Sequence, residues 1–143
     1  MLINTKGYYV LKVILFFAFS KNDSFSIKEI SKRIDVSGKV LEQVLLLLKN
    51  KGMLSSKRGP NGGYTPTVDF RKMSVMDIIK KIGGSLEVLP VDKTKEGIID
   101  EVLRNFVNDM EKTIKHKMSE IIIEDMVKEI KEKVTKNEFN FVI

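Results

Sequence analysis

Side chains that can hydrogen-bond to nucleic-acid bases are grouped in the N-terminal half of the sequence. Glu42 carries a carboxylate, which accepts from the cytosine amino group, and its neighbour Gln43 carries an amide, which pairs with adenine. Arg58 opens a glycine-rich stretch, and a guanidinium on a flexible loop can enter a narrow, electronegative minor groove. These residue types are suited to contacts with base edges and grooves of a nucleic acid.

The composition excludes several kinds of reactive site. The 143-residue chain has no cysteine, so it has no disulfide, thiolate metal site, cysteine-ligated iron-sulfur cluster or thiol nucleophile. Its single histidine, His116, has no partner ligands in the sequence and is expected on the surface. The glycines after Arg58 match neither the P-loop nor the dinucleotide-binding pattern. We expect no enzyme activity, no metal site and no cofactor.

Positive charge is concentrated in the first half of the chain. Residues 1–72 hold 13 Lys and Arg against 5 Asp and Glu, a net charge of +8, whereas residues 73–143 hold 12 against 14, a net charge of −2. A basic half is typical of a surface that binds phosphates. The alternative is a lysine-rich composition without a charged partner.

The most apolar stretch, residues 8–19, predicts a buried helix from near Thr5 to about Ser20. A membrane span needs about 20 apolar residues, and Lys12 interrupts this shorter run. With no cleavage pattern after it and no other targeting segment, we expect a cytoplasmic protein. The helix should be covered partly by its own domain and partly by a second subunit. Its aromatic residues are expected in the core rather than as a base-stacking platform: Tyr8, Tyr9, Phe16 and Phe17.

Capping signals define the next two helices. Ser26 and Glu29 have the spacing of a capping box, which begins a short second helix. After a tight turn, Ser37 can cap a third helix that ends at Gly52. A short helix, a three-to-four-residue turn and a longer helix have the spacing of a helix-turn-helix, whose second helix enters the DNA major groove.

A hairpin and a long helix follow. Residues 53–57 and 64–68 predict two strands joined by the glycine-rich loop, and Ser74 with Asp77 begins a fourth helix that ends at Gly83. Residues 85–97 are expected to be irregular, and residues 139–143 alternate like a terminal strand.

From residue 98 onward, apolar side chains recur every three or four residues, which predicts a long amphipathic helix and, from about residue 121, a short one. The simplest way to bury the apolar stripe of the long helix is packing against the same helix of a second copy. The expected dimerisation residues are Ile99, Val102, Leu103, Phe106, Met110 and Ile114.

The sequence resembles the bacterial winged helix-turn-helix regulator family that includes IscR, NsrR and CymR. The resemblance covers about the first 85 residues and, more loosely, the long helix and the short helix after it. It rests on Asn4–Tyr9, Ile27–Ile34, Val40–Gln43, Arg58–Tyr64 and Met73–Ile79. It implies a homodimeric, sequence-specific transcription regulator, a repressor, that binds a pseudo-palindromic operator in double-stranded DNA.

The implied fold is mainly α (α+β), with a two-stranded wing. Residues 1–84 would form the winged helix-turn-helix domain, with the first helix also in the dimer interface. Residues 85–97 would form a linker, and residues 98–143 the dimerisation helix and C-terminal segment.

The chain departs from the family where many members carry three cysteines that hold a sensing cluster. Residues 86–96 contain none, so cluster sensing is not carried over, and the chain resembles a subtype without these cysteines that is most similar to CymR. There the signal arrives through the enzyme O-acetylserine sulfhydrylase, so the resemblance implies an enzyme of that kind as co-regulator. A small metabolite bound between the fourth and long helices is an alternative effector.

Each basic or polar residue of the expected site has an assigned role. Glu42 and Gln43, which match the family's pair, are expected to read bases, and Arg58, assisted by Asn61, to enter the minor groove. The expected phosphate contacts are Lys6, Lys28, Ser37 and Lys39.

Simpler roles stay open for several of these residues. Ser37 could act only as a helix cap, Glu42 could be an ordinary surface acid, and Lys6 and Lys28 could be solvated lysines. The rival function is an adaptor that binds a metabolic enzyme without reading DNA.

Overall fold

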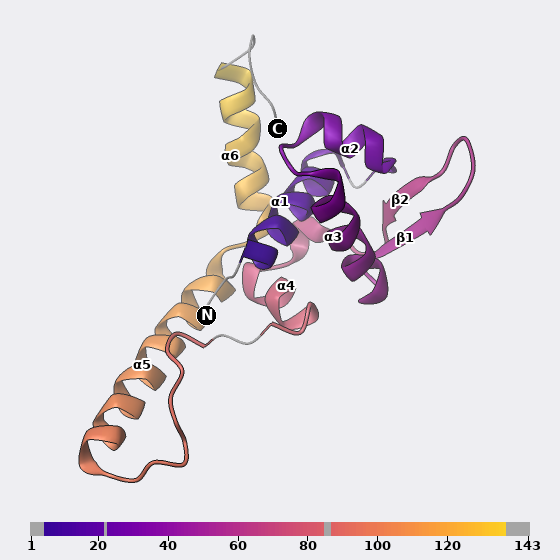
Figure 1. Ribbon diagram of the computed structural model, residues 1–143. Helices are drawn as coiled ribbons and strands as arrows, with labels where there is room; N and C mark the ends of the chain where they lie inside the picture. The colour runs from indigo at the N-terminus through magenta and orange to yellow at the C-terminus, as the bar shows by residue number, and fades with distance from the viewer. Residues whose placement is uncertain (1–4, 22, 85–86, 137–143) are drawn as a thin grey trace.

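Helices dominate the computed structural model, which describes residues 5–21, 23–84 and 87–136 (Figure 1). A two-stranded antiparallel wing projects from one side of the helical body, and one long helix projects from the other (Figure 1). The elements in chain order are α1 (Thr5–Phe19), α2 (Ile27–Arg33), α3 (Gly38–Asn50), β1 (Leu54–Lys57), β2 (Gly63–Pro66), the 3-10 helix η1 (Phe70–Lys72), α4 (Val75–Lys81), α5 (Ile98–Glu120) and α6 (Ile123–Lys136).

Helix α1 is the centre of the hydrophobic core. Its Val10 and Phe17 side chains have no solvent exposure, and the helix packs against α3, α6 and η1 of its own chain. The predicted buried helix is therefore confirmed. The prediction that Tyr8 is a core residue is wrong: its side chain is 59% exposed. At 3.6 residues per turn, Tyr8 lies on the opposite side of α1 from Val10 and Phe17.

Both predicted caps of the helix-turn-helix are present. In α2, the Ser26 Oγ accepts from the Glu29 N–H at 3.2 Å, and the Glu29 carboxylate accepts from the Ser26 N–H at 2.7 Å. The backbone hydrogen bond from Ser26, followed by the one from its side chain, lowers the pKa of Glu29. In α3, the Ser37 Oγ accepts from the Val40 N–H at 3.4 Å. These caps fix where both helices begin.

The turn between α2 and α3 is held to α1. Ile34 and Val36 are buried beneath it, and the Lys12 Nζ donates to the Asp35 carbonyl at 2.7 Å. The lysine that interrupts the apolar run of α1 thus satisfies a backbone carbonyl of the turn.

The wing is joined to the loop that precedes α2. Leu54 pairs with Pro66 and Lys57 with Gly63 between the two strands. Outside the strands, the Phe25 N–H donates to the Tyr64 carbonyl at 3.0 Å, and the Tyr64 N–H donates to the Phe25 carbonyl at 2.8 Å. A Cβ on Gly63 would lie 2.6 Å from the Phe25 carbonyl oxygen, so this approach requires glycine.

The junction of α5 and α6 is pinned to the start of α4. The Val75 N–H donates to the Ile121 carbonyl, and the Ile123 N–H donates to the Met73 carbonyl, both at 2.9 Å. The buried Ser74 caps α4 as predicted: its Oγ accepts from the Asp77 N–H at 3.0 Å.

Arg71 joins three parts of the chain. Its Nε donates to the Ala18 carbonyl of α1 at 2.9 Å and lies 3.6 Å from the Glu124 carboxylate of α6. Through this contact and the burial of Ile123 and Val127, helix α6 belongs to the same core as α1. At 14 residues, α6 is longer than the short helix predicted from about residue 121.

The segment before α5 runs beside that helix (Figure 1). Its described part, residues 87–97, has no helix or strand, as predicted. The Glu111 carboxylate accepts from the Val88 N–H at 3.2 Å, and the Arg104 Nη1 donates to the Lys95 carbonyl at 2.8 Å. The terminal strand predicted over 139–143 lies outside the described residues. Among the helices of the described ranges, none is long and apolar enough to cross a membrane.

Candidate DNA-binding surface

Helix α3 turns one face inward and presents the other to solvent. Leu41, Leu45 and Leu48 are buried, and the helix packs on α1, which fixes its rotation about its own axis. Glu42 and Gln43 consequently point outward, as contact with DNA bases requires. The exposed side chains of this outer face are Lys39, Glu42, Gln43, Leu46, Lys49 and Asn50.

The N-terminal end of α3 carries two of the predicted phosphate contacts, and a third lies on the preceding helix. Ser37 uses an Oγ lone pair as the cap acceptor, which leaves its hydroxyl proton available for a donor bond outside the helix. The cap role and a phosphate contact are therefore compatible. Lys39, in the first turn of α3, and Lys28, on α2, are both exposed.

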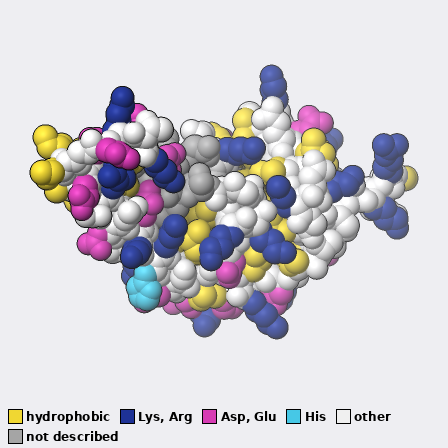
Figure 2. Space-filling view, turned by 90° about the horizontal axis from the view of Figure 1, so that it is seen from below, with side chains coloured by type: hydrophobic (Ala, Val, Ile, Leu, Met, Phe, Trp, Pro, Cys, Tyr) yellow, Lys and Arg dark blue, Asp and Glu magenta, His cyan; other side chains and the backbone are white. Residues whose placement is uncertain are grey.

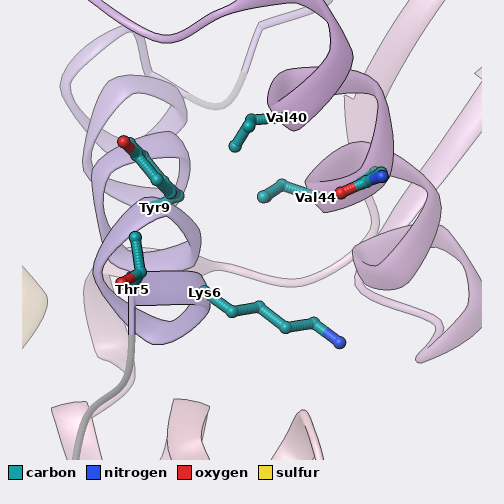
Figure 3. A pocket seen from close by; sticks show the side chains of 6 residues that line it. Thr5, Lys6, Tyr9, Val40 and Val44 are labelled. Atoms are coloured by element: carbon teal, nitrogen blue, oxygen red, sulfur yellow. The ribbon is translucent and has the colours of Figure 1, made fainter.

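A cavity of about 390 Å³ lies between the start of α1 and α3 (Figure 3). Lys6 extends from α1 along the side of this cavity, and Val40 and Val44 face it from α3 (Figure 3). Gln43 also lines it, so two predicted site residues from separate helices border one hollow. Its lining residues are Thr5, Lys6, Tyr9, Val40, Gln43 and Val44.

The wing presents Arg58 and Asn61 at its tip. Arg58 directly follows β1, and both side chains are exposed. The turn closes through a hydrogen bond from the Gly62 N–H to the Gly59 carbonyl at 2.9 Å, and Gly59 has a φ of +110°. That backbone conformation favours glycine, so the sequence at the tip matches the turn it forms.

Basic side chains extend over the face that includes the wing. Figure 2 shows Lys and Arg side chains from the middle of this face to the projection at its right edge, where Figure 1 places the wing. At the opposite end of the same face, where α5 begins, most of the acidic side chains gather, together with hydrophobic and further basic ones (Figure 2). On this face the acidic side chains thus lie mostly away from the wing (Figure 2).

The predicted dimerisation residues form an exposed stripe on α5, apart from Ile114, which is half-buried. Val102 and Phe106 are 61% and 53% exposed, although both are large apolar side chains. Ile98, which was not among the predicted residues, is 83% exposed at the start of the helix. His116 is a surface residue as expected, 3.1 Å from Glu120.

Three residues near the predicted site were not identified from the sequence. Thr5 and Tyr9 line the cavity beside Lys6, and Leu46 lies on the outer face of α3 with a 52% exposed side chain. Helical spacing could have found all three. Tyr9 follows the predicted residue Lys6 by three residues, and Thr5 lies one turn before Tyr9. Leu46 follows Glu42 by four residues and Gln43 by three.

A helix-turn-helix with an exposed second helix and a basic wing defines the class of winged helix-turn-helix regulators. A family model, Rrf2, described as an iron-dependent transcriptional regulator, matches residues 3–129. The chain therefore belongs to the Rrf2 family.

Characterised relatives agree with this membership. Over 132 residues the chain is 30% identical to the regulator IscR of Xenorhabdus nematophila, covering 90% of this chain and 80% of that one. It is 32% identical over 87 residues to IscR of Cereibacter sphaeroides, a match that spans 57% of this chain and 56% of that relative. The match to this second IscR thus spans little more than half of its length.

Solved structures of two regulators share the fold. CymR, the global cysteine regulator of B. subtilis, superposes with a TM-score of 0.72 at 26% identity, covering 90% of this chain and 97% of CymR. IscR of T. potens superposes with a TM-score of 0.66 at 27% identity, covering 93% of this chain and 90% of that one.

The residues present do not fit a cysteine-ligated iron centre. The chain has no cysteine, and residues 87–97 offer carboxylates and lysines but no histidine. Over the described residues, no group of three or more His, Asp or Glu side chains is placed to hold a metal ion. The family's description names iron, but this chain has no cysteine ligands that could hold it.

Proposed function

We propose that this protein is a homodimeric transcriptional repressor that binds a pseudo-palindromic DNA operator without an iron-sulfur cluster. The observation that carries the proposal is the outer face of α3, where Glu42 and Gln43 are exposed on a helix whose rotation is fixed by its buried side. A recognition helix needs this combination of a rigid support and free polar side chains.

Bases in the major groove are read by Glu42 and Gln43. The Glu42 carboxylate accepts from a cytosine amino group, and the Gln43 amide makes a bidentate pair with adenine. The wing places Arg58 in the adjacent minor groove, where a narrow A·T-rich segment has the strongest negative potential, and Asn61 assists it.

Phosphates are bound on both sides of the recognition helix. Lys6 and Gln43 border the same cavity, so a phosphate passing its mouth can meet the ammonium group while the amide reaches the bases. Ser37 and Lys39 donate from the start of α3, where the helix dipole favours an anion, and Lys28 contributes from α2. These contacts add affinity that falls with salt and carries no sequence information.

Dimerisation through α5 is supported by its exposed stripe. Side chains such as Ile99, 77% exposed, and Leu103, 51% exposed, would leave a contiguous apolar surface on an isolated chain. Packing α5 against its symmetry mate buries that stripe and places two recognition helices on one duplex. Two half-sites then lie about 34–36 Å apart, or a multiple of it.

Control of the repressor is proposed to come through a protein partner in the cytoplasm. The absence of cysteine leaves no thiolate cluster to sense iron or oxygen. The likeness to CymR, a global cysteine regulator, supports a signal from cysteine metabolism. The co-regulator we propose is an enzyme of the O-acetylserine sulfhydrylase kind. Adding such an enzyme should change the operator affinity in a titration, and an unchanged affinity would count against this part of the proposal.

The whole proposal can be tested by operator selection. The purified protein is used to enrich binding sequences from random duplex DNA, and the enriched duplex is titrated by fluorescence anisotropy against a scrambled one at several salt concentrations. We expect a preference of at least about a thousandfold at one dimer per duplex. Sequence-indifferent, steeply salt-dependent binding would reject it and favour the adaptor function.

A further inference from the structure

The outer face of α3 contains one large apolar side chain among polar ones. Leu46 is 52% exposed, whereas the neighbouring leucines Leu45 and Leu48 are buried. The other exposed residues of this face are Lys39, Glu42, Gln43, Lys49 and Asn50. Leu46 is not among the side chains that make up the hydrophobic core or pack against it.

Leu46 lies at the centre of this face rather than at its edge. With 3.6 residues per turn, its direction around the helix axis falls between those of Glu42 and Gln43, one turn farther along. Any surface that reaches both reading residues therefore also meets Leu46. The two lysines on the same face, Lys39 and Lys49, match the charge of a phosphate-bearing partner.

We propose that Leu46 is a third base-reading residue, which contacts the 5-methyl group of a thymine in the major groove. This inference rests on the proposed function. The thymine methyl is the one apolar group that the base edges present in the major groove, and apolar side chains discriminate by contacting it. A leucine at the centre of a DNA-facing surface fits that group, because both lose contact with water on binding.

The geometry also gives the expected position of this thymine. At a rise of 1.5 Å per residue, Leu46 lies about 4.5 Å beyond Gln43 and about 6 Å beyond Glu42 along the helix axis. Neighbouring base pairs are about 3.4 Å apart. The thymine is therefore one or two base pairs from those that Glu42 and Gln43 read, once in each half-site.

A methyl scan of the selected operator tests this inference. Each thymine is replaced in turn by deoxyuridine, which removes only the methyl group, and Kd is measured for the wild type and for Leu46→Ala. For the wild type we expect one position per half-site where uracil weakens binding about 3- to 5-fold. Leu46→Ala should bind the thymine and the uracil duplex with the same Kd at that position. Leu46→Met should restore the preference for thymine.

The matched control is Leu89→Ala, which shortens a leucine that is 48% exposed in the segment before α5. This variant should still bind the uracil duplex more weakly than the thymine duplex, as the wild type does. Circular dichroism and the oligomeric mass check that each variant is folded. If Leu46→Ala keeps the wild-type uracil pattern, or if no position responds in the wild type, the inference is overturned while the operator and the proposed function stand. If selection enriches no sequence, the proposed function fails and the inference fails with it.

Discussion

The base reading proposed for Glu42 works as much by exclusion as by attraction. Its carboxylate can only accept, so it favours the cytosine amino donor and repels the acceptors of other base edges. We predict that Glu42→Ala flattens the preference at one base pair per half-site, a loss of about 1–3 kcal/mol of discrimination. The measurement is Kd for the four possible base pairs at each operator position. An unchanged preference would remove Glu42 from the reading residues.

Lys39→Ala is the contrasting variant on the same helix face. A lysine that meets only phosphate should weaken binding to all sequences alike. Because the proposed dimer has two such lysines, the slope of log K against log salt should fall by about 1.8 in magnitude. The two variants thus separate base reading from phosphate binding within a single exposed surface.

The position of the wing depends on its close approach to the loop before α2. We predict that Gly63→Ala lowers the free energy of unfolding by about 1–3 kcal/mol, because a Cβ would lie 2.6 Å from the Phe25 carbonyl oxygen. The matched control is Gly38→Ala, where a Cβ would meet nothing within 4 Å and the change should stay within about 0.5 kcal/mol. Urea unfolding measures the free energy of unfolding of both variants. Equal stabilities for the two would show that the wing tolerates displacement.

Helix α4 carries a capping box whose contribution depends on pH. The backbone N–H of Ser74, then its side chain and the charge of Lys80, lower the pKa of Asp77 from its ordinary value of 3.8. The charged carboxylate therefore stabilises the fold fully above that value, and its contribution is lost as the pH falls through the lowered, folded-state pKa. We predict that Asp77→Asn costs about 0.5–1 kcal/mol at neutral pH and that this difference shrinks below about pH 4. If the difference in free energy of unfolding between the wild type and Asp77→Asn stays constant down to about pH 3, the charged Asp77 carboxylate is not its source.

Local patterns in the sequence were sufficient to predict most of the elements. The caps at Ser26, Ser37 and Ser74 are interactions across three residues, so they can be identified from spacing alone. The contacts that position these elements could not be predicted in this way. The bridge from Phe25 to Tyr64 and the bonds of Arg71 join residues 39 or more positions apart.

The exposed stripe of α5 gives a direct test of the proposed dimer. We predict that Phe106→Glu weakens the dimer at least about a hundredfold, since each copy would bury an unpaired carboxylate at the contact. Sedimentation should then report the 16.3 kDa chain mass rather than twice that value. Asn105→Glu places the same charge one residue away, off the apolar stripe, and should leave the dimer intact. A dimer that survives Phe106→Glu would have to form through another surface.

The spacing of the half-sites links the proposed dimer to its proposed recognition helices. A rigid dimer of the proposed kind would fix the distance between its two α3 helices, so that only half-sites at the matching separation and rotation could be bound together. We predict that inserting about five base pairs, half a helical turn, reduces wild-type binding to that of a single half-site. The monomeric Phe106→Glu variant already binds half-sites singly, so the insertion should not change its affinity. If the wild type tolerates the insertion equally well, the two DNA-binding units are not rigidly joined, and the proposed fixed spacing of the half-sites is wrong.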